Sequence, residues 1–163
     1  MSTTEDRLAI VETCTRMAWH ADRREWDELA GIFADPVTLD YTSLNGGEPA
    51  ELAPDQVVAA WSATLGAFDA TQHLITNHLV TVEGDSAVCT ASFQATHRLA
   101  NPHGGPLWTL GGTYRFDLVR ASAESGAGSG EEWKINAVVM TAIWADGNED
   151  LPSLAAAKAA ESS

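Results

Sequence analysis

The sequence predicts an α+β fold with one domain, in which two or three helices and an early strand precede four long antiparallel strands. The first observation is that residues 4–20 contain no glycine or proline and carry a stripe of residues at spacings of three and four, as amphipathic helices do. The second is that the apolar period changes to two after about residue 73. Because helices and strands are segregated along the chain, the sheet must fold over the helices to bury one face.

The N-terminal part is expected to hold two helices and a strand. The stripe of the first helix contains Leu8, Val11, Thr15, Ala18 and Asp22. A second short helix follows and is limited by Gly31 and Pro36. Residues 37–44 then alternate between apolar and polar side chains, which predicts a half-buried strand. One face of that strand carries Val37, Leu39 and Tyr41.

The rest of the chain is expected to form a helix and then the sheet. Pro54 suits the first turn of a third helix over residues 54–68, because its missing N–H costs nothing there. The four long strands are predicted at residues 73–83, 86–99, 107–120 and 132–145. The Gly/Ser-rich residues 121–132 are expected to be a mobile hairpin loop. A bent sheet around a helix would enclose a conical apolar pocket.

The domain is expected to span residues 1–148, and residues 149–163 form a tail. The tail is rich in alanine and predicts a short helix that is marginal on its own in water. Such a helix would either close the pocket or fray.

Charge and cysteine content limit the partners and the compartment. Nine Lys and Arg residues stand against 23 Asp and Glu residues, for a net charge of −14, which repels phosphate backbones and anionic lipid surfaces. Nucleic acid and membranes are therefore not expected partners. Cys14 and Cys89 form no pattern of a disulfide framework or zinc module, which suits a reducing compartment. No stretch resembles a signal peptide or a membrane span, so a cytoplasmic protein is expected.

Strand alternation separates the histidines of the segment "QHLITNH". Residues at even offsets share a face, so His73 and Asn77 are expected to point inward and His78 outward. In the next strand, His97 lies on an almost wholly apolar face and is expected to point inward too. An inward histidine is either a satisfied core residue or a functional one, and both interpretations remain open for His73 and His97.

Two further polar groups are candidates for the same interior. Asp22 continues the stripe of the first helix, and a buried carboxylate needs a donor such as an imidazole. The alternative is that Asp22 caps the second helix, with Glu25 three residues on. Tyr41 shares its strand face with Val37 and Leu39, so it either packs there or brings a hydroxyl to the site.

Other kinds of site receive little support. No two histidines have metal-ligand spacing on one element, so a metal would have to use His73, His97 and Asp22, and neither a metal nor a cofactor is expected. The chain has no G-x-S-x-G motif and no cysteine in a cationic setting. The expected aromatic wall of the pocket consists of Trp19, Trp61, Phe93 and Trp108.

The runs "ADRREWDELAGIFADPVTLDY", "TQHLITNHLV", "GDSAVCTASFQATH", "GGTYRFDLVR" and "WKINAVVM" resemble the SnoaL-like branch of the NTF2-like superfamily. The resemblance covers nearly the whole chain. Within that superfamily the chain resembles scytalone dehydratase and also hexachlorocyclohexane dehydrochlorinase. The resemblance implies an α+β cone with a strongly bent, mostly antiparallel sheet.

The resemblance also implies roles for individual residues. Asp22 and His73 match the catalytic acid and histidine of both enzymes. Tyr41 matches a tyrosine that holds a water against the substrate carbonyl in scytalone dehydratase, and His97 matches that enzyme's second histidine. The chain departs from the pattern at Ala21, where a second tyrosine is expected, and near Thr113, where an asparagine is expected.

These matches imply a cofactor-independent lyase of the dehydratase type, acting on a small apolar oxygenated molecule. His73 would remove a proton next to a carbonyl, and water or another group would leave. Two alternatives remain: a non-catalytic module that binds small molecules, favoured by the polar groups lost at Ala21 and Thr113, and an isomerase or polyketide-type cyclase. The outer face of a bent sheet favours a homo-oligomer, either a trimer or a dimer.

Overall fold

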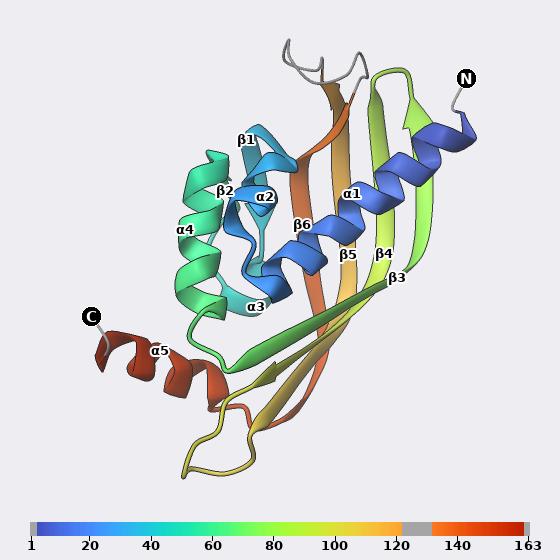
Figure 1. The fold of residues 1–163 in the computed structure, drawn as a ribbon. Coiled ribbons are helices and arrows are strands. Elements are labelled where there is room, and N and C mark those ends of the chain that lie inside the picture. The colour runs from blue at the N-terminus through green and yellow to red at the C-terminus, as the bar shows by residue number, and fades with distance from the viewer. Residues whose placement is uncertain (1–2, 122–131, 162–163) are drawn as a thin grey trace.

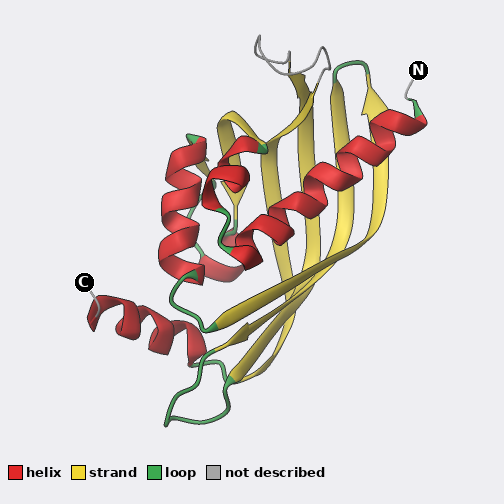
Figure 2. Ribbon diagram, in the orientation of Figure 1, coloured by secondary structure: helices red, strands yellow, loops and turns green. Residues whose placement is uncertain are grey.

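The computed structural model describes residues 3–121 and 132–161 of the chain and has the expected α+β fold. A long helix lies across the concave face of a curved, open sheet, and shorter helices cover one side (Figures 1 and 2). In chain order the elements are α1 (Thr4–Arg23), α2 (Trp26–Gly31), β1 (Phe33–Asp40), α3 (Thr42–Asn45), β2 (Ala50–Leu52), α4 (Pro54–Leu65), β3 (Ala70–Glu83), β4 (Ser86–Arg98), β5 (Leu107–Ala121), β6 (Glu132–Gly147) and α5 (Leu151–Glu161).

The sheet has six strands in the order β2-β1-β6-β5-β4-β3. Neighbours pair antiparallel throughout, except for β1 and β6, which run parallel. The four long strands that the change of period predicts are β3 to β6. They bend together toward the end of the molecule at which α5 lies (Figure 1).

The buried face of α1 differs from the predicted stripe. The helix begins with a capping box between Thr3 and Asp6. Its fully or nearly fully buried residues are Ile10, Cys14, Met17, Ala18 and Ala21. Leu8, at the start of the predicted stripe, is 65% exposed. Both stripes satisfy the helical period, so the spacing alone does not decide between them; packing against the sheet selects the one with Cys14 and Met17.

The early strand is shifted from its predicted position. β1 begins at Phe33 and ends at Asp40, and from Thr42 the chain forms α3 instead of extending to residue 44. Pro36, expected to limit the second helix, lies inside β1. The pairing of β1 with β6 is interrupted between Phe33 and Thr38, so this part of the strand tolerates a residue without an N–H. The short strand β2 was not predicted.

A bulge in β3 changes which side chains point inward. The pairing with β4 shifts between Thr76 and Leu79, and Asn77 has a φ of 58°. Inward residues are odd-numbered before the bulge and even-numbered after it. The predictions for Asn77 and His78 are therefore wrong: Asn77 is exposed, and His78 is partly buried with its Nε2 atom enclosed.

The core lies between α1 and the concave face of the sheet. The inward residues of β4 are buried from Ala87 to His97. A second, smaller cluster joins α5 to the sheet end through Leu151, Ala155, Phe68 and Leu99. Most of the predicted Gly/Ser loop lies outside the described residues. Within the described ranges, no helix is long and apolar enough to cross a membrane.

Candidate functional site

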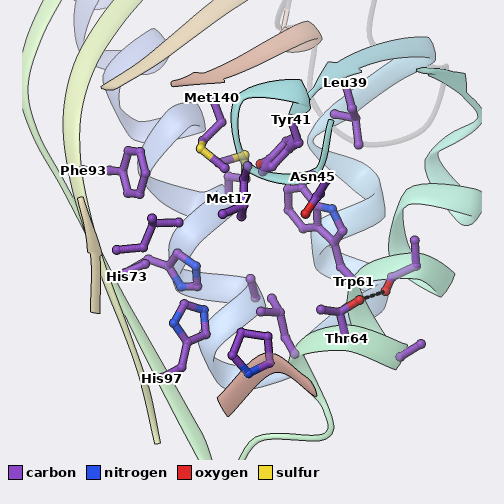
Figure 3. Close-up of a pocket in the computed structure, with 18 of the residues that line it drawn as sticks. Met17, Leu39, Tyr41, Asn45, Trp61, Thr64, His73, Phe93, His97 and Met140 are labelled. Atoms are coloured by element: carbon purple, nitrogen blue, oxygen red, sulfur yellow. Dashed lines mark hydrogen bonds between the residues drawn. The ribbon is translucent and has the colours of Figure 1, made fainter. Parts of the chain in front are cut away.

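A cavity of about 670 Å³ opens between the concave face of the sheet, α1, α4 and α5. Its wall is mostly apolar, and Glu48 is the only Asp, Glu, Lys or Arg side chain among the described residues that line it. The imidazoles of His73 and His97 lie at one end, and Tyr41 lies across the cavity near Trp61 (Figure 3). The tail helix contributes Pro152, Ala156 and Ala159 to the wall.

Asp22 hydrogen-bonds the ring of His73 through Nδ1 and so fixes its orientation. Asp22 lies in the last turn of α1, and its Oδ1 is 2.7 Å from His73 Nδ1, while its Oδ2 accepts the backbone N–H of His73 at 2.7 Å. The hydroxyl of Thr71 donates to Oδ1 at 2.9 Å. Because Nδ1 donates to a carboxylate, the lone pair of the neutral ring lies on Nε2. The helix-cap alternative for Asp22 is wrong, since α2 begins after Glu25 and receives no side-chain cap.

His97 lies beside His73 in an aromatic setting. Its ring centroid is 5.7 Å from that of His73, 4.9 Å from that of Phe68 and 4.8 Å from that of Trp108. Burial, with the neighbouring His73 as a second cause, lowers the pKa of His97 to about 4. The ring is therefore neutral at pH 7. Its Nδ1 atom is enclosed by the protein and has no hydrogen-bond partner among the described residues.

Two tyrosines form the opposite polar group of the cavity. Burial raises the pKa of Tyr41 well above its ordinary value and that of Tyr114 to about 12, so both stay protonated. The neighbouring Tyr114 adds to the rise in the pKa of Tyr41. Both side chains line the cavity, so each has a phenol proton that it can donate to a ligand.

Sequence reasoning missed Tyr114. The signal was present in β5, where Tyr114, Phe116 and Leu118 alternate as one apolar face and are all buried. That alternation sends Thr113 to the other face, where it is exposed. Thr113, which stands near the position of an active-site asparagine in the resemblance and was expected to line the pocket for that reason, is therefore outside it, and the polar side chain that lines the cavity from this strand is Tyr114.

The predicted aromatic wall is correct in part. Trp61, Phe93 and Trp108 line the cavity. Trp19 does not: it is 58% exposed on the outer side of α1, with the guanidinium of Arg23 5.1 Å from its ring. Asn77 is also outside the cavity, because the bulge turns it away. Across residues 3–121 and 132–161, no group of three or more His, Cys, Asp or Glu side chains is arranged to hold a metal.

A family model of the SnoaL-like domain matches residues 2–139. The chain belongs to the SnoaL-like family. The fold and the family that the sequence motifs indicate are thus confirmed. Among proteins of curated function, none matches this SnoaL-like chain in sequence.

Solved structures with the same fold include proteins with different functional descriptions. The Kfla4162 protein from Kribbella flavida is 32% identical, with a TM-score of 0.81 over 93% of this chain and 97% of that one. A candidate scytalone dehydratase from Novosphingobium aromaticivorans is 19% identical, with a TM-score of 0.69 over 88% of each chain. A type 2 hexachlorocyclohexane dehydrochlorinase is 16% identical, with a TM-score of 0.71 over 88% of this chain and 89% of that one. The last two structures are less than 25% identical in sequence to this chain, so their similarity to it shows a shared fold alone.

Proposed function

We propose that this SnoaL-like protein is a cofactor-independent lyase that removes a proton next to a carbonyl of a small, neutral, mostly apolar molecule and releases water or another leaving group. The observation that carries the proposal is the 2.7 Å contact between Asp22 Oδ1 and His73 Nδ1 at the wall of an apolar cavity. A histidine held by a carboxylate in this way is a general base, typically worth about 10²–10⁴ in rate.

The side chains of the site can carry out every proton transfer of this reaction without a cofactor. Nε2 of His73 takes the proton from the carbon next to the carbonyl, and the electron pair moves into the carbonyl to give an enolate. Donation from Tyr114 and Tyr41 stabilises the oxygen on which the charge develops. When the enolate reforms the carbonyl, the C–O bond to the leaving hydroxyl breaks, and the proton held by His73 converts hydroxide to water.

His97 serves as a hydrogen-bonding group in this scheme. A pKa of about 4 leaves the ring uncharged at pH 7, so it is a poor source of a proton for the leaving group. Because Nδ1 is enclosed by the protein, the ring would contact an oxygen of the ligand through Nε2, on the part of the ring that lines the cavity. We therefore assign His97 the role of holding the departing oxygen and not that of a general acid.

The wall supports a neutral substrate. Lys and Arg are missing from the described residues that line the cavity, and Glu48 would repel a carboxylate or phosphate. Trp61, Phe93 and Trp108 provide flat apolar surfaces. A homo-oligomer remains part of the proposal, because apolar side chains such as Ile143, 65% exposed, are left on β6.

A panel of one-ring and two-ring β-hydroxyketones tests the proposal. Each is incubated in D₂O with the protein, and NMR records deuterium entering next to the carbonyl and loss of water. Activity should fall by at least about 100-fold in His73→Gln and in Asp22→Asn, with unchanged circular dichroism. The exposed-loop variant His103→Gln is the matched control and should match the wild type. Equal rates in His73→Gln and wild type would refute the assignment of the base.

Two other outcomes correspond to other functions. Ala21 lies in the cavity wall without a polar group, which favours a binding module. Tight binding of panel members without exchange or water loss would support that function. Exchange without water loss, lost in His73→Gln, would instead indicate an isomerase or cyclase that uses the same pair.

A further inference from the structure

Among the described residues, every hydrogen-bond donor to the carboxylate of Asp22 lies on one strand, β3. Two donors come from His73, its backbone N–H and its ring, and the third is the hydroxyl of Thr71, two residues earlier on β3. Thr71 is 8% exposed, so its hydroxyl has little access to water. The alternation of β3 brings Thr71 and His73 to the same side, facing the C-terminal end of α1.

Arg24 joins this strand to two helices. Its Nη1 donates to Thr71 Oγ1 at 2.9 Å and to the carbonyl of Ala21 at 2.9 Å, and its Nη2 donates to the carbonyl of Leu65 at 2.8 Å. The guanidinium also lies 6.0 Å from the ring centroid of Trp26. One side chain thus connects the end of α1, the end of α4 and the start of β3.

These contacts fix the direction of the Thr71 hydroxyl. A guanidinium has donors and no acceptor, so Thr71 Oγ1 must accept from Arg24. Its single proton is then directed to Asp22 Oδ1, which also receives the ring of His73. Arg24 therefore donates to Thr71, which donates to Asp22, and the ring of His73 donates to the same carboxylate from the other side.

The backbone of Arg24 supports a specific role for its side chain. Arg24 ends α1 with a φ of 61° and a ψ of 30°, in the left-handed region that favours glycine. A non-glycine residue is strained there. The side-chain contacts of Arg24 offset that strain.

We infer that Arg24 and Thr71 are positioning residues for the Asp22–His73 pair. The guanidinium orients the Thr71 hydroxyl. That hydroxyl donates a hydrogen bond to the Asp22 carboxylate, which keeps the carboxylate in place beside His73 and stabilises its negative charge. The inference rests on the proposed function, in which His73 must be unprotonated to act as a base. The other titratable groups facing the pair are His97 from β4 and Tyr114 from β5.

The substrate-free test follows the His73 ring by ¹⁵N-edited NMR as pH changes, with the signal assigned by its loss in His73→Gln. Thr71→Val removes one hydrogen-bond donor from the Asp22 carboxylate. The carboxylate then stabilises the protonated ring of His73 more strongly, so the titration of that ring should move to higher pH by about half a unit or more. Arg24→Gly, which also relieves the positive φ, should move it in the same direction. Thr71→Ser keeps the hydroxyl and should restore the wild-type curve.

Thr96→Val is the matched control, because Thr96 shares its hydroxyl contact with Thr109, away from the pair. An unchanged or downward shift in folded Thr71→Val would overturn the inference. If Arg24→Gly fails to fold, the Thr71 variants still decide. With an active substrate, Thr71→Val should lower kcat by about tenfold with little change in KM, and the acid limb of the pH profile should move upward. A shift in the NMR titration without turnover of any substrate would refute the proposed function and leave the positioning role supported.

Discussion

Acid should destabilise this fold through His97, and replacement by glutamine should remove that part of the sensitivity. The ring is 5% exposed, and burial lowers its pKa from 6.5 to about 4. Above pH 6.5 the ring is neutral whether the chain is folded or unfolded, so it contributes no pH dependence. Between pH 6.5 and 4 the unfolded chain binds a proton that the folded chain does not, so stability falls as pH falls.

The two pKa values set the size of the effect. Each unit of difference corresponds to about 1.4 kcal/mol, so the full loss is about 3.4 kcal/mol and is reached below pH 4. Between pH 7 and pH 4.5 the loss amounts to about 2.4 kcal/mol. Other groups also titrate in this range, and the comparison between variants isolates the part that belongs to His97.

Urea unfolding at pH 7 and at pH 4.5 measures this part. The drop in the free energy of unfolding should be about 2.4 kcal/mol smaller in His97→Gln than in the wild type, whatever the stability of the variant at pH 7. The exposed histidine variant His103→Gln should show the wild-type drop. Equal drops in His97→Gln and wild type would refute the reasoning that His97 is held neutral by burial.

Two predictions concern packing. Gly112→Ala should destabilise the fold by about 1–3 kcal/mol in thermal unfolding, because its Cβ would lie 1.9 Å from the carbonyl oxygen of Thr141. The control Gly105→Ala, whose Cβ would have no atom within 4 Å, should be close to neutral in the same measurement. Phe116→Ala, fully buried, should cost about 3–5 kcal/mol by urea unfolding, against a few tenths for Leu79→Ala at 74% exposure; equal losses would contradict the described core.

The parts of the fold that depend on local period could be predicted from sequence. The change from a spacing of three and four to a spacing of two locates the helix–strand division and all four long strands. The period could not decide which stripe of α1 faces the sheet, because Leu8 and Ile10 belong to stripes of equal regularity. That choice depends on contacts with residues far along the chain.

The candidate site shows the same division. His73 and His97 could be assigned an inward direction from alternation, and Asp22 could be suggested as a partner but not separated from a helix cap. No local pattern in the sequence indicates a role for Arg24 or Thr71. Their importance comes from the meeting of α1, α4 and β3, which no segment of the sequence reports by itself.

The bulge at Asn77 has a consequence for how β3 accepts substitutions over evolutionary time. Up to Ile75 the odd-numbered positions face the site or the core, and from His78 onward the even-numbered positions do. A single deletion at the bulge would restore one phase along the whole strand and turn either the site half or the core half outward. Natural variants of β3 should therefore differ in residue type far more readily than in length. Polar residues should be tolerated at even-numbered positions before Asn77 and at odd-numbered positions after it.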